Sequence, residues 1–454
     1  MKRLTRRSFL AASAAFGAAP ALGAPSTSGE VDVVIVGAGA AGIAAARRVA
    51  AAGRHFTLIE AGPHIGGRCV TDTGIFGAPF DRGAHWIHIP ELNPIAKLAS
   101  RSEFDIYPAP TGQRLRIGRR YAREGELEDF LAALVRSNRA IAEAARGRTD
   151  VDCAAALPRD LRDWRPTVEF VLGPYGCGKE LREISALDFA RSAERDVDAF
   201  CRQGFGALLR KLGASLPVTL ATPVTRIDWG TRLEVETEKG RINARAVIVT
   251  ASTDVLAAGK IKFVPDLPKR QLDAFSQLKL GSYDHVALEL PGNPLGLQRD
   301  DMVFEKAENA RTAALLANVS GTSLAMIEVG GRFGRDLSGQ GEQAMVAFAI
   351  DWLAELFGND VRKAVRRTHA TRWSAEPWML GAFSAASPGG QGARKALMEP
   401  LRDRIWFAGE AVHETLWGTV GGAWESGVRA AEAILRKMGV LRDPPELRRA
   451  PGRR

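Results

Sequence analysis

The stretch between residues 31 and 60 alternates short apolar runs with one alanine-rich segment. Val31–Val36 is continuously apolar and rich in β-branched residues, which predicts a strand buried on both faces. Residues 40–52 are rich in alanine, a strong helix former, and Gly53 is placed to end that helix. Residues 56–59 form a second apolar run, which ends at Glu60. This order of strand, helix and strand predicts an α/β, Rossmann-like fold.

Three glycines connect the first predicted strand to the predicted helix. Gly37, Gly39 and Gly42 have the spacing G-x-G-x-x-G. In this motif the first glycine permits a tight turn, the second lets the backbone approach a pyrophosphate, and the third allows close packing of helix on strand. The helix N-terminus offers unpaired N–H groups to phosphate. A carboxylate about 20 residues on, here Glu60, accepts hydrogen bonds from ribose hydroxyls, so a dinucleotide site is predicted.

Later apolar runs predict a helical insertion and a second sheet. Residues 87–198 predict a mainly helical insertion, whose longest helix runs from Glu126 to about Arg146. Between residues 265 and 379 the pattern predicts a mixed sheet and one helix that ends at Gly358. Strands are predicted at 218–220, 224–228, 233–237, 241–243, 246–251, 285–290, 302–304, 313–319, 324–329 and 404–410.

Two motifs after Glu60 indicate which dinucleotide is bound. Gly66-Gly67-Arg68 follows the acid closely, and FDRGAHW at residues 80–86 lies shortly beyond. With these motifs the chain resembles the flavin-containing amine oxidase family, which includes the monoamine and polyamine oxidases. The resemblance implies FAD rather than NAD, with Arg68 near the pyrophosphate and residues 83–86 near the flavin ring. It also implies a Rossmann-like FAD-binding domain of the glutathione-reductase type, interleaved with an α+β substrate domain.

Two motifs in the C-terminal part extend the resemblance. Residues 373–384 read WSAEPWMLGAFS, similar to the family's W-x-x-D/E-P-x-x-x-G-S/A-Y/F-S stretch, and residues 404–410 predict a buried strand that ends in Glu410. The resemblance implies that Glu410 binds the sugar or pyrophosphate side of FAD. It also implies that the helix opening at Thr419 and Val420 points its N-terminus at the pyrimidine edge of the flavin, where a positive dipole end stabilises negative charge.

The cofactor-binding residues implied in this way come from separated segments. They are Gly37, Gly39, Ala41, Gly42, Glu60, Ala61, Gly67, Arg68, Gly83, Ala84, His85, Trp86, Val224, Gly409, Glu410, Thr419 and Val420. The FAD-binding domain is predicted at 30–86, 204–262 and 385–440, and the substrate domain at 87–203 and 263–384. No second glycine motif follows a strand and the cysteines and histidines lack metal-like spacing, so neither a separate NAD(P)H site nor a metal is expected.

Departures from the family pattern concern the predicted catalytic residues His285, Phe383, Thr419 and Trp417. His285 stands where the family usually has a lysine that holds a water near the flavin; it is either a substitute handler of water or protons, or a strand histidine with a structural role. Phe383 keeps one wall of the family's aromatic pair, and Thr419 replaces a common tyrosine. Either Trp417 or Trp424 supplies the other wall, or both are packing residues. Because residues 381–384 lack the cysteine of members with covalent flavin, the resemblance implies non-covalent FAD.

The N-terminal residues predict a destination for the protein. Arg6 and Arg7 precede a small apolar run with Ala-x-Ala-like sites, so residues 1–24 look like a twin-arginine signal that exports the folded protein to the periplasm. The apolar part is too short for a stable membrane span. Removing this leader, with its four basic residues and no acid, lowers the formal charge from +10 to 10 − 4 = +6, which does not call for a nucleic-acid partner. Residues 441–454 are expected to be a solvated basic tail.

The resemblance implies a reaction in which the C–N bond of a small-molecule amine is oxidised. Hydride passes to the flavin, the imine hydrolyses to an aldehyde or ketone, and oxygen or a periplasmic electron acceptor reoxidises the flavin. Two alternatives stay open. One is an enzyme of the same fold that oxidises C–C bonds, as desaturases and porphyrinogen oxidases do; the other is a flavin-binding protein without turnover.

Overall fold

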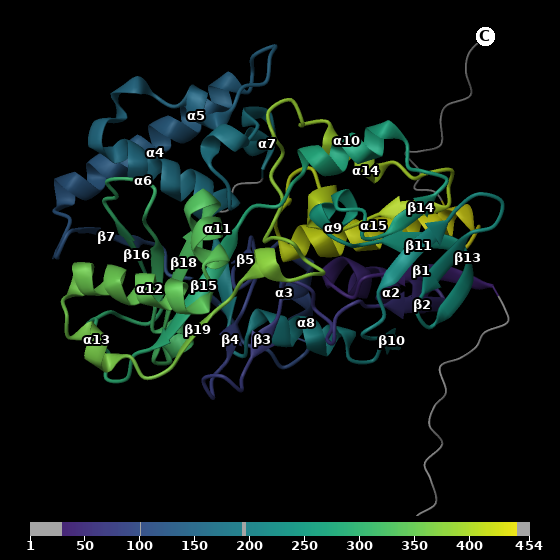
Figure 1. Cartoon of the computed structure of the whole chain (residues 1–454), viewed down its shortest axis with the longest axis horizontal. Helices are drawn as coiled ribbons and strands as arrows, with labels where there is room; N and C mark the ends of the chain where they lie inside the picture. The colour runs from purple at the N-terminus through teal and green to yellow at the C-terminus, as the bar shows by residue number, and fades with distance from the viewer. Residues whose placement is uncertain (1–29, 100, 193–196, 443–454) are drawn as a thin grey trace, which may run out of the picture. The chain divides into compact units, whose positions relative to one another are not determined.

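The computed structural model describes residues 30–99, 101–192 and 197–442 (Figure 1). The predicted export signal and all but the first two residues of the predicted basic tail lie outside these ranges. Within the ranges, no helix has the length and apolar character that crossing a membrane requires.

A parallel sheet forms around the predicted first strand. β1 (Val31–Val36) pairs in parallel with β2 (Phe56–Ile59) on one side and with β13 (Gly240–Val249) on the other. β10 (Val218–Thr219) extends the sheet beyond β2, and β20 (Ile405–Phe407) pairs in parallel with the far side of β13. Strands from three distant parts of the chain therefore end at the same edge of this sheet.

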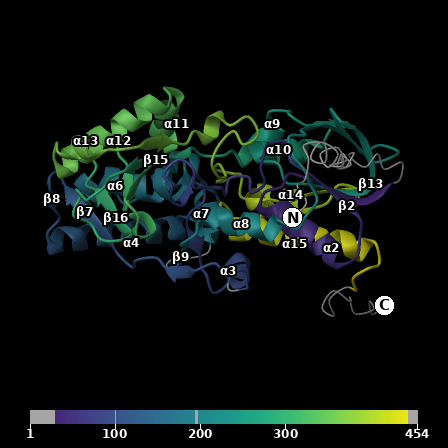
Figure 2. The ribbon, with the colours of Figure 1, turned by 90° about the horizontal axis from the view of Figure 1, so that it is seen from below.

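Both faces of β1 are buried, as the sequence predicts. Its alternate residues Val33 and Ile35 pack under α2 (Ala40–Ala51), α8 (Phe205–Gly213) and α15 (Val420–Lys437). Val31, Val34 and Val36 pack into a second core with the strands β11 (Val224–Asp228), β12 (Glu234–Thr237), β13 and β14 (Lys262–Val264) and with the helices α9 (Thr253–Ala257), α10 (Lys269–Gln277) and α14 (Ala393–Met398). Figure 2 shows α2 and α15 side by side. The two helices can approach closely because Gly427 of α15 has no side chain. A Cβ atom on Gly427 would lie 2.1 Å from the carbonyl oxygen of Ala41.

The strands that follow β10 correct one detail of the sequence analysis. Residues 241–243 and 246–251 were expected to form two strands, but β13 is one continuous strand of ten residues. Its first half pairs antiparallel with β12 (Glu234–Thr237) and its second half pairs in parallel with β1. The change from polar to apolar residues along β13 marks this change of partner rather than a break in the chain. β11 (Val224–Asp228) and β14 (Lys262–Val264) complete the sheet.

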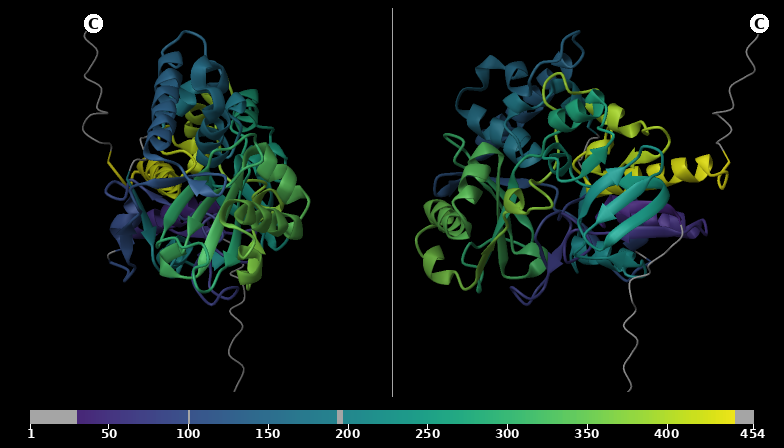
Figure 3. Two further views of the ribbon diagram at one scale, coloured as in Figure 1. Left: turned by 90° about the vertical axis from the view of Figure 1, so that its left-hand side faces the viewer. Right: turned by 45° about the vertical axis from the view of Figure 1, so that its right-hand side comes forward.

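A second, seven-stranded sheet lies beside the first (Figures 1 and 3). Its order is β19 (Thr368–Ala370), β15 (Tyr283–Glu289), β18 (Leu324–Gly330), β17 (Ala314–Ala317), β16 (Asp301–Glu305), β7 (Gln113–Ile117) and β8 (Arg120–Tyr121). α12 (Glu342–Phe357) covers one face, with Gly358 at its end as predicted. Aromatic and aliphatic residues of the insertion, including Phe130 and Phe170, cover the other face.

The insertion is less helical than the sequence pattern predicts. α4 (Glu124–Ala144), α5 (Cys153–Ala156), α6 (Arg165–Phe170) and α7 (Ala186–Arg191) are present, and α4 matches the predicted long helix closely. However, β7 leaves the insertion to pair in parallel with β16 in the second sheet. A strand of this length has too few residues to show a clear period, and its partner lies far away in the sequence.

Short elements connect these layers. β3 (Thr71–Asp72) pairs with β4 (Phe80–Asp81), and β5 (Ile87–His88), β9 (Asp198–Cys201) and β6 (Ile106–Pro108) form a small sheet. The remaining α-helices of the described ranges are α3 (Pro94–Ala99), α9 (Thr253–Ala257), α10 (Lys269–Gln277), α11 (Gly331–Gly339), α13 (Val361–Ala364) and α14 (Ala393–Met398).

Candidate active site

A cavity of about 1010 Å³ is lined by residues of both sheets and of the insertion. This volume is at the upper end of the range for small-molecule sites. One part of the lining comes from the turn between β1 and α2, the end of β2 and the start of α15. The other part comes from β15, β16 and α4. The cavity therefore joins the predicted nucleotide site to the second sheet.

The turn between β1 and α2 forms a cradle for an anion. Gly37 has a φ of +101°, and its N–H donates to the carbonyl of Ile59 at 2.7 Å. The first intrahelical bond of α2 runs from Ile43 N–H to the carbonyl of Gly39 at 2.9 Å, so the N–H groups before Ile43 have no acceptor in the helix. Gly42 does not line the cavity; a Cβ there would lie 1.9 Å from the carbonyl oxygen of Gly37. These contacts agree with the turn predicted at Gly37 and the close packing predicted at Gly42, and the free N–H groups of the turn suit a pyrophosphate.

Glu60 is held rigidly where β2 ends. Its Oε2 accepts from the N–H of Ala38 and its Oε1 from the N–H of Gly62, both at 2.7 Å. The carboxylate lines the cavity, and each oxygen keeps a further lone pair. Glu60 is therefore placed to accept from ribose hydroxyls, as the motif implies.

Glu410 and Arg68 form a second polar group on the cavity wall. Arg68 Nη1 lies 3.1 Å from Glu410 Oε1. Glu410 Oε2 accepts from the N–H of Gly418 at 2.9 Å and from Ser384 Oγ at 2.8 Å. The carboxylate thus joins the end of β20, the approach to α15 and the segment around Ser384 at one point.

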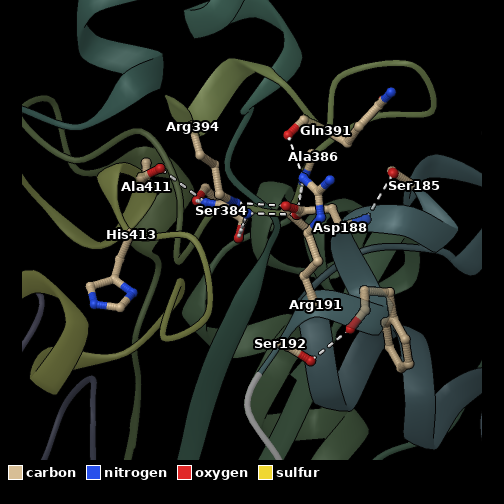
Figure 4. Close-up of polar contacts among 12 residues, drawn as sticks. Ser185, Asp188, Arg191, Ser192, Ser384, Ala386, Gln391, Arg394, Ala411 and His413 are labelled. Carbon is tan, nitrogen blue, oxygen red and sulfur yellow. Dashed lines mark hydrogen bonds and ion pairs between the residues drawn. The ribbon is translucent and has the colours of Figure 1, made fainter. Parts of the chain in front are cut away.

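Figure 4 shows a buried ion pair between Arg394 and Asp188, which is linked to Glu410 through the hydroxyl of Ser384. Arg394 of α14, 1% exposed, donates to both carboxylate oxygens of Asp188 of α7, each at 2.8 Å. The same guanidinium donates to Ser384 Oγ at 3.1 Å and to the carbonyl of Ala411 at 3.1 Å. Its carbon lies 4.8 Å from the centre of the Trp417 ring. The pattern of the sequence around Arg394 had not suggested this role.

Thr419 serves as the N-cap of α15. Its Oγ1 accepts from the N–H of Gly422 at 2.9 Å and donates to the carbonyl of Leu416 at 2.7 Å. Thr419 and Val420 line the cavity, so the positive end of the α15 dipole faces it. A threonine at this position is therefore explained by helix capping.

For the aromatic wall opposite Phe383, the structure agrees with the alternative in which Trp417 and Trp424 are packing residues. Trp417 and Trp424 are both buried and neither lines the cavity, because Trp417 packs beneath Arg394 and Trp424 packs in the core under α2. Trp417 is thus misplaced among the predicted catalytic residues. Tyr283 of β15 instead lines the cavity with its ring centre 5.7 Å from that of Phe383. The alternation of a strand would have revealed it, because Tyr283 and His285 share a face.

His285 lies on the cavity wall rather than in a core remote from it. Its Nδ1 is 3.0 Å from the carbonyl oxygen of Asp81, and its backbone N–H donates to Thr371 Oγ1 at 2.9 Å. Burial lowers the pKa of His285 to about 4. The ring is therefore neutral near pH 7 and keeps a fixed orientation.

Most of the residues predicted from the sequence lie together around the cavity. Every implied cofactor residue except Gly42 lines the cavity, and so do His285, Phe383 and Thr419. The substrate side adds residues that sequence reasoning missed: Leu127, Leu131, Leu134, Val171, Leu172, Tyr175, Met302 and Phe304. His88 and Asp198, paired at 2.7 Å, also line it. The apolar residues were read as core, because a single sequence does not show which core faces a cavity.

A Rossmann-like sheet with this cradle, joined by one cavity to a second sheet, suits a dinucleotide bound beside a substrate pocket. The family comparison is more specific. Residues 40–435 match the sequence profile of the flavin containing amine oxidoreductases, and the chain belongs to this family. The family implies FAD as the cofactor, in agreement with the cradle, Glu60 and the α15 N-terminus.

Similar proteins include histone demethylases and polyamine oxidases. Lysine-specific histone demethylase 1B of Mus musculus is 27% identical over 440 residues, which are 88% of this chain and 52% of the demethylase. Probable polyamine oxidase 4 of Arabidopsis thaliana is 25% identical over 437 residues, 89% of this chain and 87% of the oxidase. The chain therefore spans about half the length of the demethylase and most of the polyamine oxidase.

Solved structures confirm the predicted fold class. Cyclohexylamine oxidase from Brevibacterium oxydans IH-35A superposes with a TM-score of 0.77 at 20% identity, covering 90% of this chain and 100% of that one. Wild-type putrescine oxidase bound to putrescine superposes with a TM-score of 0.76 at 20% identity, covering 90% and 99%. At this identity the likeness concerns the fold.

Proposed function

We propose that this protein oxidises the C–N bond of an amine to an imine, which water then hydrolyses to an aldehyde or ketone. The observation that carries the proposal is the single cavity that connects the nucleotide cradle to an apolar and aromatic pocket. Family membership supports amine chemistry, and the names of the similar oxidases point to small amines. The aliphatic wall favours an amine carried on an apolar body.

One group of residues in the cavity is placed to bind FAD, and another is placed to orient the substrate. Bound FAD supplies the hydride acceptor. The N-termini of α2 and α15 and the carboxylates of Glu60 and Glu410 hold the nucleotide in one position. Phe383 and Tyr283 confine the substrate so that its α C–H bond faces the cofactor, which removes orientational freedom before the reaction. Burial keeps the His285 ring on this wall free of charge near pH 7.

Anaerobic mixing of the FAD-loaded protein with a panel of amines tests the proposal. We expect cyclohexylamine, putrescine or benzylamine to bleach the flavin absorption, and an apolar monoamine to do so at the lowest concentration. Bleaching by a porphyrinogen or a polyene, and by no amine, would instead support C–C oxidation. Absence of bleaching by every compound would support a flavin-binding protein without turnover.

We also propose that FAD is bound without a covalent bond. Residues 381–384 contain no cysteine, and the thiol of Cys69, which lines the cavity, has its pKa raised well above the usual value by burial. A thiol that stays protonated is a poor nucleophile. Acid precipitation of the holoprotein is expected to leave yellow flavin in the supernatant. Flavin that pellets with the protein would contradict this expectation.

Export and reoxidation are proposals that rest on the sequence. The Arg6-Arg7 pair supports a periplasmic destination, where oxygen or a periplasmic electron acceptor would reoxidise the flavin. We expect the R6K/R7K double variant to remain in the cytoplasmic fraction while the unmodified chain reaches the periplasm. Equal distribution of the two proteins would count against a twin-arginine signal.

A further inference from the structure

Glu328 is a buried acid beside the cavity, close to the side chains of Tyr283 and Trp86. It lies on β18, directly opposite His285 of β15 in the antiparallel register, and it is 1% exposed. Among the described residues, neither of its carboxylate oxygens has a hydrogen-bond partner. An acid that only supports the sheet looks different. Glu305 on β16 accepts from Thr312 Oγ1 at 2.6 Å and from the indole N–H of Trp352 at 2.5 Å.

The tautomer of His285 is set by the backbone. A carbonyl oxygen can only accept, so the contact from His285 Nδ1 to the carbonyl of Asp81 places the ring proton on Nδ1. In the neutral ring Nε2 is then an acceptor. Nε2 lies 3.7 Å from Glu328 Oε1. The acceptor nitrogen of a residue that lines the cavity and the carboxyl of Glu328 therefore lie close together.

We propose that Glu328 is a positioning residue that, through His285, lets the site take one proton from an amine substrate. This inference rests on the proposed amine oxidation. An N–H bond of the substrate's ammonium group breaks, its electron pair stays on nitrogen, and the proton forms an N–H bond at His285 Nε2. The carboxylate of Glu328 stabilises the imidazolium that results. The amine is then neutral, as loss of hydride from its α carbon requires.

The protonation state of Glu328 determines whether it can stabilise a charged His285. Burial raises the pKa of Glu328 to about 7, and the neighbouring His85, Tyr283 and Trp86 side chains oppose that rise. The ionisable side chains near the pair are Tyr283 of the same strand as His285, and Tyr175, His85 and Asp81 from other segments. Below pH 7 the carboxyl already holds a proton and cannot stabilise an imidazolium. Above pH 7 it is charged, so proton uptake is expected to rise through about pH 7.

Infrared difference spectroscopy of the FAD-loaded protein tests the titration without any amine. The C=O band of a buried protonated carboxyl is expected to disappear with a midpoint near pH 7 in the unmodified protein. E328Q should lack this titration, and the matched control E305Q, which alters a partly buried acid of the same sheet outside the cavity lining, should keep it. The same titration in E328Q as in the unmodified protein would overturn the proposal.

The rate of flavin reduction by cyclohexylamine under anaerobic conditions tests the role in the reaction. E328Q is expected to slow reduction at pH 7.5 by about 100-fold, the lower end of the effect of acid–base groups, and to remove the rise near pH 7. E305Q should retain both the rate and its pH profile. A uniform loss in E328Q with an unchanged profile would show a structural role only. If cyclohexylamine reduces no variant, the proposed function fails for this amine while the infrared result still decides the titration.

A second variant covers the case in which E328Q does not fold. H285Q replaces the neutral ring nitrogen beside Glu328 with an amide group whose N–H can donate to the carboxylate, which favours the charged form of Glu328. The infrared midpoint is therefore expected to move to lower pH by at least one unit. A midpoint that stays in place would show that the two side chains are not coupled.

Discussion

Replacing Asp188 by alanine is expected to lower the free energy of unfolding by about 3–5 kcal/mol. Arg394 would then be left as a charge in a fully buried site, where it now donates to both oxygens of Asp188 (Figure 4). The N–H of Ala386, which donates to Asp188 Oδ2 at 3.0 Å, would lose its acceptor as well. Denaturant unfolding of the FAD-loaded protein, followed by fluorescence, measures the loss.

Two further variants distinguish the cost of leaving Arg394 unpaired from the cost of breaking any ion pair. The double variant D188A/R394M removes the unpaired charge, so it should recover a large part of the lost stability. D273A breaks an exposed ion pair with Lys269, at 2.7 Å, and should cost less than about 1 kcal/mol. If D188A costs no more than D273A, the buried pair does not support the fold as described.

The same ion pair also bears on the cofactor. Arg394 donates to Ser384 Oγ, which in turn donates to Glu410 Oε2 on the cavity wall. Loss of Asp188 therefore frees a guanidinium beside two groups that position Glu410. We expect D188A to lose bound FAD at a lower denaturant concentration than the one that unfolds it. If FAD is lost only when the protein unfolds, the Arg394–Asp188 ion pair stabilises the core and has no separate role at the FAD site.

Replacing Gly42 by alanine is expected to raise the Kd for FAD by at least about 100-fold, which corresponds to about 3 kcal/mol. The added Cβ would lie 1.9 Å from the carbonyl oxygen of Gly37 and 3.0 Å from its carbonyl carbon. Backbone atoms cannot rotate away as a side chain does. The helix α2 must therefore move off β1, and its N-terminal N–H groups move with it away from the pyrophosphate position.

Titration of apoprotein with FAD, followed by quenching of flavin fluorescence, measures this change. Gly125 gives a matched control, because it lies in the first turn of α4 and nothing lies within 4 Å of an added Cβ. G125A should bind FAD as the unmodified protein does and be slightly more stable, since alanine favours a helix. Normal FAD affinity in G42A would show that the turn tolerates a wider spacing than the structure indicates.

The nucleotide side of the cavity could be predicted from local patterns. The turn at Gly37, the acid at Glu60 and the helix start at Thr419 each depend on a few neighbouring residues and on backbone groups. Such features leave a fixed spacing in the chain. The residues of the substrate side have no motif of fixed spacing in the sequence. For this reason Trp417 was predicted at the site, whereas Tyr283 lines the cavity. Both are aromatic residues near a predicted motif, and only packing decides which one faces the cavity.

The sequence by itself determined the α/β fold class and the dinucleotide cradle, because these follow from short-range periodicity and from glycines whose spacing the backbone requires. Its motifs also carried the resemblance to the family, and that resemblance implies FAD. Only the tertiary structure decided that β7 joins the second sheet, that Arg394 supports Glu410, and that Glu328 faces His285. Each of these contacts joins segments far apart along the chain. Burial and pairing across strands arise when those segments pack together, and no local pattern records them.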